Sequence, residues 1–250
     1  MITTVWSYGG GTQSAAIAVL VLTGQLPKPD YVVMADTSRE VTETWNYLRD
    51  VVQPELTRFG CPVEVIPHSY ASVDITTNNG TVLLPAFTTQ GAKVGKLPTY
   101  CSSEWKKYPV RRWLRERGVD KCDLWLGISL DEVERMKPSD VQWITHTWPL
   151  IEIVPCSRHK CVSLVEGYGW PTPPKSRCWM CPNMSPRSWR QLQKEYPADF
   201  AKAVDLEIEL QVADPHIYLH PAGQSLPIAV ENSKAQGELF DGCDSGFCFT

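Results

Sequence analysis

The sequence lacks an apolar run long enough to cross a bilayer: its longest covers residues 15–22, and a spanning helix needs about 20. It has no basic excess either, because 24 Lys and Arg oppose 28 Asp and Glu, giving a net charge of −4. No general attraction to nucleic acid or membranes follows. The start shows no basic segment before an apolar one, so we expect no secretory signal and a cytoplasmic location.

Two common nucleotide signatures are also missing. No Gly-Lys-Ser/Thr follows the glycines near the start, and no third glycine completes a G-x-G-x-x-G pattern. An extended stretch at 2–6 instead leads into a glycine turn, and an apolar helical run follows at once. Glycine amides and a helix N-terminus bind anions, so we expect a phosphate or nucleotide site rather than a turn that merely needed glycine. Its candidate residues are Ser7, Gly9, Gly10, Gly11, Thr12, Gln13 and Ser14.

The remaining pattern alternates strands and helices. Expected strands are 2–6, 31–35, 63–67, 123–128 and 142–148; expected helices are 13–23, 42–59, 104–117, 157–168, 186–196 and 197–211. We predict an α/β fold, a Rossmann-like parallel sheet with flanking helices, plus a smaller helical, cysteine-containing C-terminal region. The predicted domains are a nucleotide-binding domain at 1–150 and this C-terminal region at 151–250, whose last forty residues lack periodicity.

Several short motifs follow the glycine turn in a fixed order. They are Asp36-Thr37-Ser38 with Glu43-Thr44, Cys101-x-x-x-x-Lys106-x-x-Pro109, and Gly127-x-x-x-x-Glu132-x-x-Arg135. Together with the turn, they resemble the phosphoadenosine phosphosulfate (PAPS) reductase-like family of the PP-loop ATP pyrophosphatase superfamily, of the kind that phages also carry. Two positions depart from that family's Ser-Gly-Gly-x-Asp-Ser loop, since Gly9 replaces the first serine and Gln13 the aspartate.

The resemblance implies an adenine nucleotide as ligand, either ATP with Mg²⁺ or a PAPS-like compound. Asp36, Thr37 and Gly127 would line the nucleotide site with the loop. Lys106 and Arg135 would contact phosphates and neutralise developing charge during catalysis.

Nine cysteines form the other strong signal. Cys178-x-x-Cys181 has the spacing of a metal-binding turn, although a redox dithiol or two incidental thiols also fit. Cys101 and Cys161 would complete four ligands, with Cys156 competing against Cys161 for its place. The resemblance implies a [4Fe–4S] cluster or zinc here, because related proteins bind one of them through four such cysteines. No adjacent Cys-Cys pair, typical of cluster-containing sulfonucleotide reductases, is present.

The remaining cysteines have other expected roles. Cys243 loosely matches the family's nucleophilic cysteine in a C-terminal tail, and Cys248 lies near it. The alternative is a tail that packs without a redox role, or whose cysteines join the metal site. Cys61 and Cys122 are expected to be small core residues.

A basic helix raises the question of the substrate. Its charges are either a solvated face or an anion patch, and they are Lys106, Lys107, Arg111, Arg112, Arg115 and Arg117. Candidate partners are thus an adenine nucleotide, a nucleic-acid or nucleobase substrate, a sulfur or electron donor protein, and a second copy of the chain in a homo-oligomer. No membrane partner is expected.

Three functions are consistent with these residues. The first is cleavage of ATP to AMP and pyrophosphate to activate a substrate, for example a nucleobase, for cluster-assisted sulfur transfer. The second is reduction of PAPS or a similar sulfonucleotide by a C-terminal cysteine. The third is a nucleotide-binding module without turnover. The products distinguish them: pyrophosphate for the first, sulfite for the second, none for the third.

Overall fold

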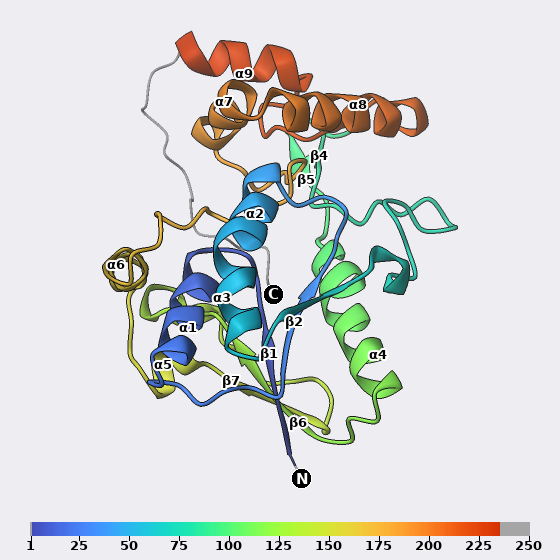
Figure 1. The fold of residues 1–250 in the computed structure, drawn as a ribbon. Helices are drawn as coiled ribbons and strands as arrows, with labels where there is room; N and C mark the ends of the chain where they lie inside the picture. Colours follow the sequence, from blue (N-terminus) through green and yellow to red (C-terminus); the bar gives the residue numbers. More distant parts are fainter. Residues whose placement is uncertain (1, 236–250) are drawn as a thin grey trace. The chain divides into compact units, whose positions relative to one another are not determined.

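A computed structural model describes residues 2–235, which fall into two compact units (Figure 1). Unit 1 consists of residues 2–70 and Trp105–Ser176, and unit 2 of Ala71–Glu104 and 177–235. Each unit is therefore assembled from two separate stretches of chain. Residue 150, where the sequence suggests a soft boundary, lies inside unit 1. Among the described helices, none has the length and apolar character that a membrane crossing requires.

Unit 1 is built on a five-stranded sheet in the order β3-β2-β1-β6-β7. Every neighbouring pair is parallel, so the predicted α/β parallel-sheet fold is confirmed. Val5 at the centre pairs with Tyr31 on one side and Leu124 on the other. The strands are β1 (Thr3–Ser7), β2 (Tyr31–Ala35), β3 (Val63–Ile66), β6 (Cys122–Leu126) and β7 (Ile144–Thr147).

Helices cover the two faces of this sheet. Successive strand residues point to opposite faces, so Trp6 enters one core cluster and Val5 the other. The core containing Trp6 packs α1 (Thr12–Leu22), α3 (Gln53–Arg58) and α6 (Arg158–Gly167); α1 also contacts α5 (Pro149–Glu152). The core containing Val5 packs α4 (Tyr108–Glu116). The apolar run at 15–22 thus forms the buried helix α1.

The helix expected over 42–59 contains a widened turn. It runs through α2 (Thr42–Tyr47), a π-helical segment (Leu48–Val52) and α3. Pro54, the second residue of α3, cannot donate a backbone hydrogen bond to the preceding turn, which accounts for the local change in pitch. The helix expected over 104–117 behaves alike, because a π-helical segment (Ser103–Lys107) precedes α4 and Pro109.

Unit 2 combines helices with a small antiparallel sheet. The sheet has the order β5-β4-β8, from β4 (Phe87–Thr88), β5 (Gly95–Lys96) and β8 (Ile217–Tyr218). Its helices are α7 (Pro186–Glu195), α8 (Pro197–Ala213) and α9 (Leu226–Ala235). The expectation that the last forty residues lack a periodic element is wrong for α9. Leu226, Ala229 and Val230 are spaced along one helical face and are buried, where α9 contacts α7 and α8.

The strand order of unit 1 fixes where a ligand would bind. From β1 the chain proceeds to β2 and β3 on one side, while β6 and β7 extend the sheet on the other. The β1–β6 pair is therefore the topological switch point, and open α/β sheets bind ligands beyond the carboxyl ends of the strands there. The glycine turn after β1 and the segment after β6 both begin at this edge.

Candidate functional site

The glycine loop connects β1 directly to the N-terminus of α1. Ser7 is the last residue of β1, Gly11 caps α1, and Thr12 is its first residue. The Gly9 amide donates to the Ser14 hydroxyl over 2.8 Å, which fixes the turn. Gly10 has φ +78°, a conformation that favours glycine. The loop thus places backbone amides at the positive end of an 11-residue helix.

Close neighbours explain why side chains are absent at Gly10 and Gly11. A Cβ atom on Gly10 would lie 2.5 Å from the Thr44 methyl carbon, closer than atoms can pack. A Cβ on Gly11 would lie 3.2 Å from the backbone nitrogen of Ser176 and 3.3 Å from its Cβ. Thr44 is fully buried, and its hydroxyl has no hydrogen-bond partner within the described structure. Segments far apart in sequence therefore converge on the glycines.

The segment after β6 meets the loop at the switch point. The Gln13 side-chain amide donates to Glu132 Oε2 over 3.0 Å and to the Ser129 hydroxyl over 3.3 Å. Arg135 donates to the other Glu132 oxygen over 2.7 Å, and both side chains of this pair are largely buried. A Cβ on Gly127 would lie 3.4 Å from that of Gln13. Gln13 and Arg135, predicted separately from sequence, thus share the Glu132 carboxylate, and Gly127 lies against Gln13.

Asp36 and Thr37 follow β2 at the same sheet edge. The Ser38 amide donates to the Asp36 carboxylate over 2.6 Å, and Ser38 has the positive φ of 57°. Thr37 is fully buried, and its carbonyl accepts from the Arg39 guanidinium over 2.8 Å. That guanidinium also lies over the Trp105 ring, 4.6 Å from its centre. These contacts hold the turn that contains Asp36 and Thr37.

Glu40 joins the predicted Lys106 to the loop, a role that the sequence did not reveal. The Glu40 side chain is only 1% exposed, and Lys106 Nζ donates to its Oε1 over 3.1 Å. The Ser176 hydroxyl donates to its Oε2, also over 3.1 Å. A buried charge needs such partners, so Glu40 fixes both donors. The only sequence signal was the nearness of Glu40 to the Asp36-Thr37-Ser38 motif.

The four predicted metal ligands are divided between the units. Cys101, Cys178 and Cys181 belong to unit 2, whereas Cys161 is fully buried in the α1 core of unit 1 beside Cys156. Burial, with Cys156, raises the pKa of Cys161 to about 12, so its thiol is protonated at neutral pH.

Residues 2–235 contain no group of three or more His, Cys, Asp or Glu side chains arranged to hold a metal ion. The four-cysteine quartet therefore stays a prediction. Cys243 and Cys248 lie outside the described residues. Cys61 and Cys122 are buried core residues, as expected.

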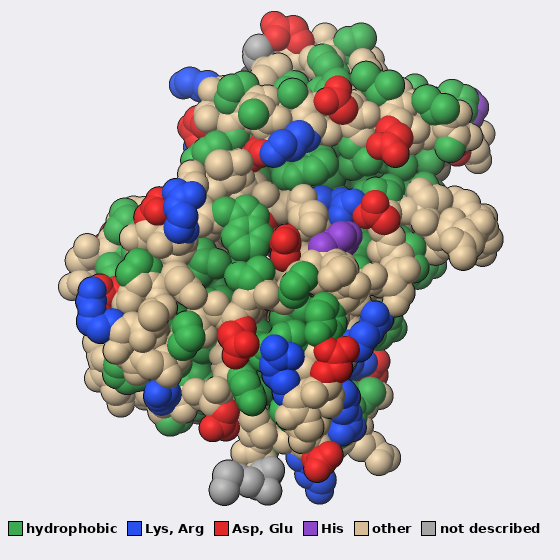
Figure 2. Space-filling model, turned by 45° about the vertical axis from the view of Figure 1, so that its right-hand side comes forward, with side chains coloured by type: hydrophobic (Ala, Val, Ile, Leu, Met, Phe, Trp, Pro, Cys, Tyr) green, Lys and Arg blue, Asp and Glu red, His purple; other side chains and the backbone are tan. Residues whose placement is uncertain are grey.

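Acidic partners neutralise much of the basic helix. Lys107 and Arg111 both pair with Asp140, and the pKa of this carboxyl is held below its usual range chiefly by the Arg111 hydrogen bond. Arg117 and Arg115 stack over the rings of Trp113 and Trp143. Figure 2 shows Lys and Arg side chains interspersed with Asp and Glu on this face of the molecule. These contacts favour a solvated, paired surface over an anion patch.

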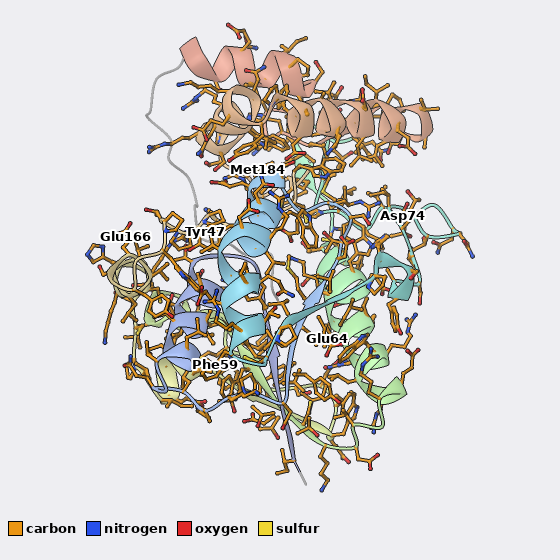
Figure 3. All side chains as sticks on the ribbon, in the orientation of Figure 1. Tyr47, Phe59, Glu64, Asp74, Glu166 and Met184 are labelled. Atoms are coloured by element: carbon orange, nitrogen blue, oxygen red, sulfur yellow. The ribbon has the colours of Figure 1, made fainter. Side chains whose placement is uncertain are left out.

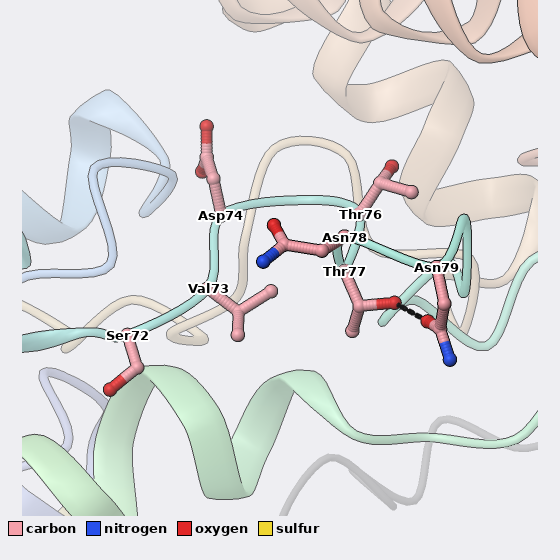
Figure 4. Close-up of a pocket in the computed structure, with 7 residues that line it drawn as sticks. All are labelled: Ser72, Val73, Asp74, Thr76, Thr77, Asn78 and Asn79. Carbon is pink, nitrogen blue, oxygen red and sulfur yellow. Dashed lines mark hydrogen bonds between the residues drawn. The ribbon is translucent and has the colours of Figure 1, made fainter.

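A hollow in unit 2 does not coincide with any predicted site. It is lined by one loop, residues 72–74 and 76–79, whose side chains are mostly short and polar (Figure 4). Asp74 is the only charged residue among them. The site with convergent chemistry is the glycine loop of unit 1.

The solved structures to which this chain is similar include the following two. A PAPS reductase from Candida auris, in a phosphate complex, has a TM-score of 0.44 and 10% identity, over 69% of this chain and 76% of that one. A U34-tRNA thiolase, NcsA, from Methanococcus maripaludis with its [4Fe–4S] cluster has a TM-score of 0.47 and 14% identity, over 97% of this chain and 74% of that one. No family model and no curated protein matches the sequence. Likenesses this distant carry no argument about activity, which depends on the site itself.

Proposed function

We propose that this chain is a PP-loop enzyme that binds an adenine nucleotide at the glycine loop. The observation that carries the proposal is the meeting of Gln13 with Ser129 and Glu132 at the switch point, beside amides at the start of α1. The Gly10 and Gly11 amides and the Ser14 hydroxyl would hold phosphates, and Asp36 and Thr37 would flank the adenosine. Ser7, Gly9 and Thr12 complete the loop.

The proposed reaction is activation of an acceptor by ATP. An acceptor oxygen, for example on a nucleobase, attacks the α-phosphorus, the bond from that phosphorus to the bridging oxygen breaks, and pyrophosphate leaves. Negative charge grows on the departing phosphates, so Lys106 and Arg135 would stabilise the transition state. Mg²⁺ bound to the ATP phosphates would supply further charge neutralisation. No step is assigned to a metal cluster.

A second candidate substrate is PAPS or a related sulfonucleotide. The loop, residues 7–14, contains no carboxylate, since Gln13 is a neutral amide, and this suits a nucleotide that arrives without a divalent cation. A cysteine thiolate would attack the sulfur, the bond from sulfur to the phosphate oxygen would break, and the nucleotide would leave. A second thiol would then displace sulfite and form a disulfide. Cys243 stays the proposed nucleophile.

Binding and product assays test these proposals. Titration calorimetry with ATP, PAPS and adenosine, with and without Mg²⁺, measures recognition; pyrophosphate, AMP and sulfite are the products to quantify. Lys106→Ala should weaken ATP or PAPS binding, while its neighbour Lys107→Ala, which pairs with Asp140, should not. Binding without any product across acceptors would favour the non-catalytic module. A chain that binds neither ATP nor PAPS contradicts the proposed function.

A further inference from the structure

Residues 171–176 form a segment that ends beside the glycine loop, and we name this segment the strap. Its end is close to Gly11, because a Cβ there would be 3.3 Å from the Ser176 Cβ and 3.6 Å from the Pro174 carbonyl oxygen. Its start is held by Tyr47, whose hydroxyl donates to the Pro171 carbonyl over 2.9 Å; Figure 3 labels Tyr47 on α2. Pro173 and Pro174 are buried. Anchors at both ends thus fix the strap to unit 1.

The strap brings a hydroxyl donor to the loop. The Ser176 hydroxyl shares the buried Glu40 carboxylate with Lys106. The Glu40 carboxylate therefore accepts hydrogen bonds from two donors, an ammonium and a hydroxyl. Phosphate oxygens accept hydrogen bonds from the same kinds of donor. Thr44, whose methyl carbon lies against the neighbouring Gly10, has a fully buried hydroxyl without a hydrogen-bond partner in the described structure. A buried hydroxyl left unpaired is costly, which points to a ligand that completes it.

We propose that Ser176 is a ligand of the nucleotide phosphates, delivered by the strap. The inference rests on the proposed function and extends it to a residue outside the resembling motifs. On binding, the Ser176 hydroxyl moves its hydrogen bond from Glu40 to a phosphate oxygen beside Gly11. Ser176 is the last residue of unit 1 and precedes Cys178 by two positions.

Binding measurements on the full chain test the contact. Ser176→Ala should weaken ATP binding by about tenfold, the effect of one hydrogen bond to a charged group, and should leave adenosine binding unchanged. Ser163→Ala, which removes an exposed hydroxyl on α6, is the matched control and should bind both like the wild type. Circular dichroism verifies that each variant is folded. Equal loss of adenosine and ATP binding would indicate a structural role and overturn the proposal.

Trypsin provides a second readout, because Lys175 and Arg177 flank Ser176. ATP should slow cleavage after both residues in the wild type, and this protection should be lost in Ser176→Ala at an ATP concentration that saturates the variant. Unchanged ATP affinity in Ser176→Ala, or protection that persists in it, overturns the inference alone. A wild-type chain that binds neither ATP nor PAPS overturns the proposed function and this inference together.

Discussion

The side-chain amide of Gln13 donates a hydrogen bond to the Glu132 carboxylate over 3.0 Å. Glu132 in turn accepts from Arg135 over 2.7 Å, so the Gln13 amide and the Glu132 carboxylate link the glycine loop to Arg135. This contact explains the departure from the aspartate of the resembling family. An aspartate at position 13 would place two negative charges together at a largely buried point, whereas glutamine supplies a donor.

The charge at position 13 can be tested with an isosteric pair of variants. Gln13→Asp and Gln13→Asn shorten the side chain equally, but only the first adds a charge facing Glu132. We expect the free energy of unfolding of Gln13→Asp to be about 1–2 kcal/mol lower than that of Gln13→Asn at pH 8. The gap should close as pH falls, because protonating one carboxyl removes the repulsion. Urea denaturation at several pH values measures it, and a gap that is independent of pH contradicts this account.

Gly10 should tolerate no side chain, for two separable reasons. Its φ of +78° disfavours any L-residue, and a Cβ would lie 2.5 Å from the Thr44 methyl carbon. Gly24 has a similar φ of +73°, but a Cβ added there would have no atom within 4 Å. We expect Gly24→Ala to cost about 1 kcal/mol of stability and Gly10→Ala about 2–4 kcal/mol, with loss of nucleotide binding.

Thr44→Ser, combined with Gly10→Ala, identifies the clashing group. Serine lacks the methyl carbon that Gly10→Ala would meet, so the double variant should recover part of the stability lost in Gly10→Ala. A double-mutant cycle measured by thermal unfolding gives the coupling free energy, which should exceed about 1 kcal/mol. Purely additive effects would mean that the glycine is required only for its backbone conformation.

The hydroxyl of Thr44 should cost stability and contribute to binding. Thr44→Val keeps the shape of the side chain and removes a buried hydroxyl that lacks a partner within the described residues. We expect the free energy of unfolding to rise by about 1 kcal/mol and ATP affinity to fall by about fivefold. Thr44→Ser, which retains the hydroxyl, should keep the affinity. A less stable Thr44→Val variant with normal affinity contradicts the prediction.

The sequence predicted the parallel sheet and the glycine loop well, because both depend on local patterns. Alternating apolar segments and helix-ending glycines are readable in short windows. It missed α9, whose helical face of Leu226, Ala229 and Val230 is short and follows an irregular stretch. The discontinuity of the two units was also missed, since contacts between distant stretches leave no local signal.

At the site, the hydrogen bonds between residues far apart in the chain could not be predicted from the sequence. Gln13 appeared only as a departure from a motif, and its partner Glu132 lies 119 positions away. Ser176 belongs to no motif, and its bond to Glu40 spans 136 positions. Pairings of this kind depend on the fold bringing strand ends together, so they become visible only with the structure.

Cys161 should be chemically inert in the native protein. Its pKa is raised to about 12 by burial and by Cys156, so the thiol is protonated at pH 8 and unreactive. We expect iodoacetamide at pH 8 to leave Cys161 unmodified in the folded protein and to modify it after unfolding in guanidinium, as followed by peptide mass spectrometry. Rapid native alkylation would contradict the burial.

Metal analysis of oxygen-free preparations extends this test to the quartet. Iron, zinc and acid-labile sulfide per chain would be measured for the wild type, Cys161→Ala and Cys178→Ala. Cys161 is fully buried among apolar side chains of the α1 core, so we expect Cys161→Ala to leave the metal content of the wild type unchanged. Loss of metal in both variants would instead support the four-cysteine site and would contradict the burial of Cys161 in the α1 core.

The buried imidazole of His220 in unit 2 should make stability depend on pH. Burial lowers the pKa of His220 from 6.5 to about 4, and its Nδ1 accepts from the Ala222 amide over 3.2 Å. In the unfolded chain the His220 ring takes up a proton near pH 6.5, whereas in the folded chain it does so only near pH 4. The stabilising effect of the neutral ring is therefore complete above pH 6.5 and is lost as pH falls toward 4, by up to about 3 kcal/mol.

Urea denaturation between pH 4 and 7 tests this dependence. His220→Asn retains an acceptor and should flatten the pH dependence of the free energy of unfolding. His159→Asn, an exposed control on α6, should not flatten it. Equal pH dependence in all three proteins would show that His220 titrates normally.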